Sequence, residues 1–244
     1  MEHNPPRIKF CGITNALDAE RAVDAGAWAI GLIFWPSSRR RCPPERAAEI
    51  AAAFSRRVEV VGVFVNPTID YLVKAAENVA PTMLQLHGDE GPAFCAEAAR
   101  RTGCKVIKAA RVRSGADIQA LASYHTDFHL LDSHIPGVPG GTGETFSWEL
   151  AQAHGREVPV ILSGGLTPSN VGEAIAAVNP FAVDVATGVE SSPGQKDPQK
   201  LEAFSDAVAR VHAPEPPAPH AAPDGRAHAR ARGGVHARPR TRTP

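Results

Sequence analysis

The chain has 244 residues, of which 43% are hydrophobic and 21% charged, and its formal net charge at pH 7 is zero. This length can bury the core of one large domain or of two small ones. No stretch approaches the roughly 20 apolar residues that cross a bilayer, and residues 1–7 are polar without an apolar signal region, so we expect a cytoplasmic protein with no membrane partner.

Short apolar runs alternate along the chain with longer alanine-rich segments whose apolar residues recur at helical spacing. This alternation is typical of β/α units and a parallel sheet. Eight runs are predicted strands: residues 7–11, 29–34, 59–65, 83–86, 105–109, 128–131, 158–162 and 181–185. The predicted helices occupy residues 16–25, 43–54, 69–78, 93–101, 168–178 and 197–211. Several strands are continuous apolar runs, as expected when helices cover both faces of a sheet.

Eight β/α units in roughly 210 residues match the α/β class known as the (β/α)₈ TIM barrel, whose active sites lie at the C-terminal ends of the strands. We therefore predict a single catalytic domain over residues 1–211. A doubly wound open sheet is the structural alternative, but its GxGxxG dinucleotide fingerprint is missing after the first strand.

Residues 212–244 are rich in proline, alanine, arginine and histidine and show no apolar periodicity, which predicts a disordered tail. Six arginines against two acidic residues give this tail a formal charge of +4 and leave −4 on the rest of the chain. The tail is either a weak phosphate- or nucleic-acid-binding arm or a dispensable extension. The absence of interleaved aromatic residues favours the extension, so we expect no nucleic-acid partner.

The four cysteines, Cys11, Cys42, Cys95 and Cys104, have neither CxxC spacing nor the density of a disulfide-stabilised secreted scaffold. No spacing of His, Asp and Glu resembles a metal site, and no segment has the GxSxG frame of a nucleophile elbow. We therefore expect no metal, no disulfide framework and no cofactor.

Three glycine-bearing turns follow predicted strands in the last third of the chain. Their predicted phosphate-binding residues are Gly141, Thr142, Gly143, Gly164, Gly165, Thr187 and Gly188. Glycine permits both the unusual dihedral angles and the close approach that a backbone N–H anion site requires, and a following helix adds its positive dipole. The turns predict a small-molecule substrate that carries a phosphate.

Two residues at strand ends are candidates for proton transfer. Cys11 ends the first strand, where positive charge or helix dipoles can lower the thiol pKa from about 8.5 and make it a general base. Asp132 ends the sixth strand, where desolvation raises a carboxyl pKa and allows a general acid. The structural alternatives are a small buried residue for Cys11 and a turn cap for Asp132.

Three further polar residues are candidates for binding substrate. Arg40 follows the second strand and can hold a carboxylate through two parallel hydrogen bonds, although three successive arginines usually form a solvated loop. His87 ends the fourth strand and can orient substrate or satisfy a strand-end carbonyl. Asp184 lies inside an apolar strand, so it must face a polar barrel opening or pair with a base.

The segments that hold these residues resemble, in order, those of the phosphoribosylanthranilate isomerases of tryptophan biosynthesis. The matching stretches are residues 9–15, 31–40, 61–67, 84–89, 106–109, 130–133, 140–148, 162–171 and 181–196. The resemblance implies a (β/α)₈ barrel that converts N-(5-phosphoribosyl)anthranilate, a phosphosugar, to 1-(2-carboxyphenylamino)-1-deoxyribulose 5-phosphate. This acid–base Amadori rearrangement uses no metal or organic cofactor.

The resemblance also implies roles for the candidate residues. Cys11 falls on the general base, Asp132 on the general acid, and Arg40 on the arginine that grips the anthranilate carboxylate. The glycine turns match the phosphate site, while His87 and Asp184 match active-site positions. One departure is the last turn, where Thr187 stands in place of a serine-rich sequence.

Several alternatives stay open from the sequence. A bifunctional isomerase that also acts on the histidine-pathway aminoaldose would place an aspartate where Cys11 stands. Indole-glycerol phosphate synthase would carry a catalytic lysine near the first strand end and an extra N-terminal helix. The chain could also be a non-catalytic phosphosugar-binding or nucleic-acid-binding protein. The sequence does not separate a monomer from a homodimer.

Overall fold

The structure is a computed structural model that describes residues 5–132, 148–155 and 157–211. Eight parallel strands form a closed barrel in chain order, and the last strand pairs with the first. They are β1 (Arg7–Cys11), β2 (Ala29–Ile33), β3 (Glu59–Phe64), β4 (Met83–Leu86), β5 (Lys105–Arg111), β6 (Phe128–Asp132), β7 (Val160–Ser163) and β8 (Ala182–Val185). The predicted (β/α)₈ fold is confirmed, and the open-sheet alternative is wrong. The predicted tail lies outside the described residues.

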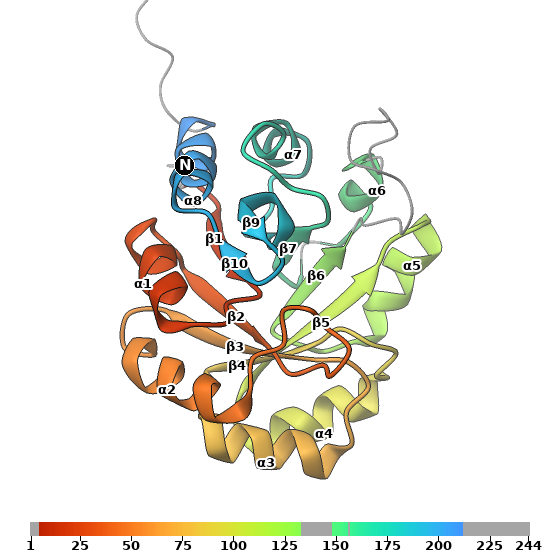
Figure 1. Cartoon of the computed structure of the whole chain (residues 1–244). Helices are drawn as coiled ribbons and strands as arrows, with labels where there is room; N and C mark the ends of the chain where they lie inside the picture. Colours follow the sequence, from red (N-terminus) through yellow and green to blue (C-terminus); the bar gives the residue numbers. More distant parts are fainter. Residues whose placement is uncertain (1–4, 133–147, 156, 212–244) are drawn as a thin grey trace, which may run out of the picture. The chain divides into compact units, whose positions relative to one another are not determined.

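Helices surround the barrel (Figure 1). They are α1 (Ala16–Asp24), α2 (Pro44–Phe54), α3 (Ile69–Val79), α4 (Pro92–Thr102), α5 (Gly115–Ala120), α6 (Trp148–Gln152), α7 (Val171–Val178) and α8 (Pro198–Arg210), with 3₁₀ turns η1 (Leu121–Ser123) and η2 (Thr187–Val189). None of the helices in the described ranges is long and apolar enough to span a bilayer.

Some short elements were not predicted. Helix α5 has six residues and is set by a capping box between Ser114 and Asp117, which is too short a segment for helical periodicity to reveal. The hairpin of β9 (Glu190–Ser192) and β10 (Gln195–Lys196) turns at Gly194, whose φ of +83° favours glycine. This hairpin follows β8 and supplies two residues to the site described below.

The alternation of side chains along the strands decides which groups enter the barrel. In β1, Ile8 and Phe10 pack in the layer between barrel and helices, and the ring of Phe10 lies 6.1 Å from that of Phe204 on α8. Cys11 instead belongs to the inner layer, with residues such as Met83 and Ile107. Because strand side chains alternate, Lys9 shares the inward face with Cys11.

A buried ion pair between Lys108 and Glu90 fixes the loops after β3 and β4. The Lys108 Nζ atom donates to Glu90 Oε2 at 2.8 Å and to the Gly88 carbonyl at 2.7 Å. The other Glu90 oxygen accepts from the backbone N–H of Asn66 at 2.7 Å. One carboxylate therefore ties two loops to β5, and the second of these loops begins with His87.

A histidine pair links β6 to the segment after α6. The His129 Nε2 atom lies 3.2 Å from the Tyr124 carbonyl, which only accepts, so Nε2 carries the proton. The neutral ring then accepts at Nδ1 from His154 Nε2, at 2.8 Å. Burial and the neighbouring His154 lower the pKa of His129 to about 4. Protonation would set two N–H groups against each other.

This pair predicts that stability falls in mild acid. An unfolded histidine binds its proton near pH 6.5, whereas His129 in the folded protein does so only near pH 4. The contribution of neutral His129 to the free energy of unfolding is therefore fully present above about pH 6.5. It decreases by up to about 3 kcal/mol as the pH falls to about 4.

Urea unfolding between pH 4 and 7 checks this prediction. We expect the slope of unfolding free energy against pH to become shallower in His129→Phe, and to stay as in the parent in His125→Phe, which replaces an exposed histidine. An equal dependence of unfolding free energy on pH in the parent and in His129→Phe would contradict the lowered pKa of His129.

Candidate active site

A buried ion pair joins β1 to β8 inside the barrel. Lys9 and Asp184 are direct partners in the strand register, and Lys9 Nζ donates to Asp184 Oδ1 at 2.7 Å. The other oxygen, Oδ2, accepts from Ser163 Oγ on β7 at 3.1 Å. Lys9 is fully buried and Asp184 nearly so. Of the two possibilities left open by the sequence, Asp184 therefore pairs with a base.

Cys11 lies beside this pair, at the C-terminal end of β1, and is 6% exposed. Burial raises the pKa of its thiol, and the charge of Asp184 raises it further. Lys9, by charge and hydrogen bond, and Lys196, by charge, act in the opposite direction but do not outweigh burial. From the sequence we expected positive charge to lower the pKa of the Cys11 thiol. The positive charges are present, but the net shift of the pKa is upward.

A glycine on β2 makes room for the thiol. The Gly31 residue pairs with Cys11 in the strand register. A Cβ atom at Gly31 would lie 2.8 Å from Cys11 Sγ and 3.3 Å from Lys9 Nζ. Any larger residue would therefore push on both groups, so this glycine is part of the site.

Asp132 and His87 meet at the ends of β6 and β4. The His87 Nε2 atom lies 3.1 Å from Asp132 Oδ2, and both side chains are partly exposed, at 22% and 18%. On the other side of the ring, the Gln85 amide nitrogen donates to Nδ1 at 2.7 Å. This bond leaves the ring proton on Nε2, directed at the carboxylate. His87 therefore contacts the predicted acid.

Arg40 is the arginine of its loop that turns inward, whereas Arg39 and Arg41 are exposed. Its Nε and Nη2 atoms donate to the two oxygens of Glu190, at 2.8 and 2.7 Å. A second Nη2 bond reaches Thr187 Oγ1 at 3.2 Å. The loop after β2 is thus bound to the segment after β8.

The predicted phosphate turns after β7 and β8 lie against each other. Gly164 and Gly165 have φ values of +99° and +64°, which favour glycine. A Cβ atom on Gly188 would overlap the carbonyl oxygen of Leu166. The two backbones therefore approach closely only because Gly188 has no side chain. The third predicted group, Gly141, Thr142 and Gly143, lies outside the described residues.

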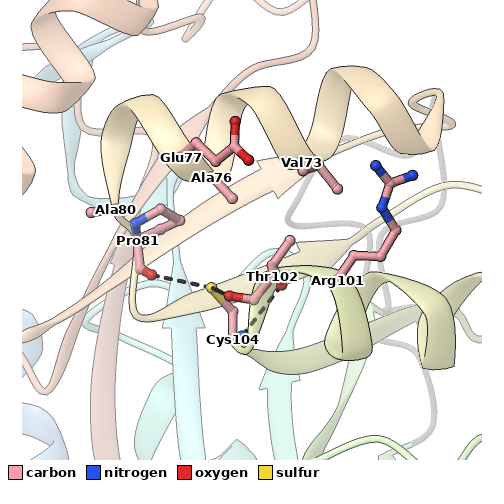
Figure 2. A pocket seen from close by; sticks show the side chains of 8 residues that line it. All are labelled: Val73, Ala76, Glu77, Ala80, Pro81, Arg101, Thr102 and Cys104. Carbon is pink, nitrogen blue, oxygen red and sulfur yellow. Dashed lines mark hydrogen bonds between the residues drawn. The ribbon is translucent and has the colours of Figure 1, made fainter.

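Two cavities are lined, apart from Lys196, by none of the residues described so far in this section. One, of about 320 Å³, opens between α3 and α4 and is shown in Figure 2. Its lining includes Pro81 and Cys104, which precede β4 and β5, so it lies at the N-terminal end of the barrel. The second, of about 710 Å³, is lined by residues of α1, of the β9–β10 hairpin, among them Lys196, and of the start of α8. In this fold, catalytic residues come from the C-terminal ends of the strands. The first cavity lies at the opposite, N-terminal end of the barrel.

Three charged residues of the site, Lys9, Glu190 and Lys196, were not predicted. Lys9 had a sequence signal, because it is a charge inside an apolar strand and lies two positions before Cys11. Glu190 and Lys196 had none, because they follow the last strand and their partners are far away in the chain. The Lys196 Nζ atom donates to the Cys11 carbonyl at 2.7 Å and lies 3.2 Å from Glu190 Oε1.

Comparison with known proteins identifies the family. A family model described as N-(5'-phosphoribosyl)anthranilate (PRA) isomerase matches residues 8–207. The chain belongs to this family. An N-(5'-phosphoribosyl)anthranilate isomerase from Geobacter metallireducens is 48% identical over 198 residues, which are 81% of this chain and 96% of the relative. One from Citrifermentans bemidjiense is 46% identical over 195 residues, 80% of this chain and 93% of the relative.

Solved structures of the family have the same fold. The phosphoribosyl anthranilate isomerase of Thermotoga maritima matches with a TM-score of 0.75 and 40% identity over 84% of this chain and 98% of its own. A phosphoribosyl anthranilate isomerase in complex with reduced 1-(o-carboxyphenylamino)-1-deoxyribulose 5-phosphate matches with a TM-score of 0.72 and 38% identity, over 83% and 98% of the two chains.

Close packing at Gly188 gives a testable prediction. In Gly188→Ala, the added methyl group must push the turn after β8 away from Leu166, which we expect to cost about 1–3 kcal/mol of stability and to weaken phosphate binding. Gly115→Ala is the matched control, because a Cβ there meets nothing within 4 Å.

Thermal unfolding and calorimetric titration with inorganic phosphate measure both effects. We expect the control to match the parent in each. A Gly188→Ala protein with the stability and the phosphate affinity of the parent would show that this contact does not shape the site.

Proposed function

We infer that the protein isomerises N-(5'-phosphoribosyl)anthranilate to 1-(2-carboxyphenylamino)-1-deoxyribulose 5-phosphate in tryptophan biosynthesis. It is an aldose–ketose isomerase that works by an acid–base Amadori rearrangement. The observation that carries this conclusion is the position of a thiol and a carboxyl, Cys11 and Asp132, at the C-terminal ends of β1 and β6 in a barrel of this family. Both groups can transfer protons, and neither requires a metal or a cofactor.

The reaction needs an acid first and a base second. Asp132 protonates the ring oxygen of the furanose, which opens the sugar and leaves a cationic iminium at C1. The iminium acidifies the hydrogen on C2, and the thiolate of Cys11 removes it. The resulting enolamine tautomerises to the ketone. Each proton transfer contributes roughly 10²- to 10⁴-fold to the rate.

The surroundings of Cys11 suit a base that is needed only after the ring opens. In the free protein, burial keeps the pKa of the thiol raised, in spite of Lys9 and Lys196. The iminium adds a further positive charge next to the thiol, which favours the thiolate at the step where the proton is removed. In this scheme Lys9 and Asp184 act on substrate only through Cys11.

Two anchors hold the opened chain. Arg40 binds the anthranilate carboxylate, and the turns that contain Gly165 and Gly188 bind the phosphate through backbone N–H groups. The turn around Thr142 completes the phosphate site in this proposal. With both ends held, the flexible intermediate stays over the acid and the base. His87 positions Asp132 through the hydrogen bond at 3.1 Å.

We propose further that the protein acts in the cytoplasm as a monomer or homodimer. All four cysteines are free thiols, as expected in a reducing compartment. A Thermotoga maritima relative is named as a dimeric enzyme from which monomers have been generated. The described residues contain no group of three or more His, Cys, Asp or Glu that could hold a metal ion. We expect no nucleic-acid partner, and we expect a chain truncated after Val211 to remain active.

Loss of anthranilate fluorescence on conversion of freshly made N-(5'-phosphoribosyl)anthranilate tests the proposal. We expect activity in the parent and a fall in kcat of about 10²- to 10⁴-fold in Cys11→Ala and in Asp132→Asn, because each removes one proton-transfer group. Cys104→Ala, at the far end of the barrel, is the matched control and should keep the parent rate.

Three other results would each lead to a different conclusion about the proposed function. A folded but inactive parent would contradict the isomerase itself. An active parent with unchanged kcat in either site variant would remove that residue from the acid–base pair. Activity on the histidine-pathway aminoaldose, measured with the same proteins, would favour the bifunctional alternative.

A further inference from the structure

A buried carboxylate behind Arg40 has no role in the reaction as described so far. Glu190 is the first residue of β9 and is 6% exposed. Burial would raise its pKa, but the hydrogen bond from Arg40 and the charges of Lys196 and Arg40 hold the pKa below its usual range. It is therefore an anion fixed between two cations, directly behind the group that is to bind the substrate carboxylate.

Glu190 occupies the Nε and Nη2 edge of the Arg40 guanidinium. Arginine has five N–H groups, one on Nε and two on each Nη. Glu190 accepts from Nε at 2.8 Å and from Nη2 at 2.7 Å, and Thr187 Oγ1 accepts from Nη2 at 3.2 Å. Among the described residues, no hydrogen-bond partner of Arg40 Nη1 is seen. The single N–H of Nε and both N–H groups of Nη2 are thus occupied, and the two N–H groups of Nη1 remain for a second carboxylate.

The charges of this cluster also fit a second carboxylate. Arg40 and Lys196 contribute two positive charges and Glu190 one negative charge, so the cluster has a net charge of +1. Two further hydrogen bonds hold Lys196 in place, because its Nζ atom donates to the carbonyls of Cys11 at 2.7 Å and Ala186 at 3.1 Å. A bound carboxylate would bring the cluster to neutrality without displacing Glu190.

The same cluster is attached to the backbone around Cys11. Gly12 has a φ of +77°, and a Cβ atom on it would lie 2.7 Å from Cδ of Arg40. The stem of Arg40 therefore lies against the residue that follows Cys11. Together with the Lys196 bond to the Cys11 carbonyl, this contact fixes the guanidinium relative to the thiol.

We propose that Glu190, supported by Lys196, is a positioning residue that holds Nε and Nη2 of Arg40 so that the remaining Nη1 group binds the substrate carboxylate. This inference rests on the proposed function. It predicts that Glu190 governs affinity for ligands that carry an aromatic carboxylate, while inorganic phosphate binds independently of it. Glu190 itself touches no substrate.

The test compares two ligands on four proteins. The ligands are reduced 1-(o-carboxyphenylamino)-1-deoxyribulose 5-phosphate, which carries carboxylate and phosphate, and inorganic phosphate. The proteins are the parent, Glu190→Gln, Glu190→Asp and the control Glu202→Gln, which changes an exposed glutamate on α8. Calorimetric titration gives each Kd, and steady-state kinetics give kcat and KM.

In Glu190→Gln we expect the Kd of the reduced product analogue and the KM to rise about 10- to 100-fold, as for loss of a charge-assisted bidentate pair. We expect kcat to change much less and the Kd for phosphate to stay within about twofold. Glu190→Asp, which keeps the charge, should recover part of the affinity. In an Arg40→Met background, Glu190→Gln should have little further effect, because it acts through Arg40.

Unchanged affinity for the analogue in Glu190→Gln would overturn the proposal, and so would an equal loss for both ligands, which would indicate general disruption. If Glu190→Gln does not fold, the same comparison of ligands in Glu190→Asp decides. A parent that neither turns over substrate nor binds the analogue contradicts the proposed function itself, whereas with an active parent these results concern Glu190 alone.

Discussion

The Lys9–Asp184 ion pair is the interaction on which the site depends. It lies inside the barrel at the point where β8 pairs with β1, so it forms part of the closure of the sheet. Removing one partner of a buried pair leaves a charge without compensation, at a cost of about 3–5 kcal/mol. The same pair places an ammonium group beside Cys11. Closure of the barrel and the chemistry of the thiol therefore depend on one contact.

A second group of charges contacts the backbone of Cys11. Lys196 bonds to the Cys11 carbonyl and to Glu190, which in turn holds Arg40. The first pair thus acts on the thiol. The second group acts on the thiol through the charge of Lys196, on the Cys11 backbone and on the proposed carboxylate anchor. The β9–β10 hairpin supplies both Glu190 and Lys196, so this short element after the last barrel strand provides both charges that support Arg40.

Much of the fold could be predicted, because strands covered on both faces appear as apolar runs and helices as periodic ones. Helix α5 and the β9–β10 hairpin were too short for either pattern. Within the site, Cys11 and Asp132 could be found because they end strands. Glu190 and Lys196 could not, because their roles come from contacts across the chain; Arg40 and Glu190 are 150 positions apart. The direction of the Cys11 pKa shift depends on burial, which the sequence does not measure.

The most direct test of this account is the ionisation of Cys11, followed as ultraviolet thiolate absorbance against pH, with the matching Cys11→Ser protein subtracted each time. The parent is compared with Lys9→Met/Asp184→Asn, in which neither buried charge is left alone. We predict a pKa above the usual thiol range in the parent and a still higher pKa in the double variant, because Lys9 lowers it more than Asp184 raises it. A parent thiol that titrates in or below its usual range, or a pKa unaffected by loss of the pair, would contradict the account.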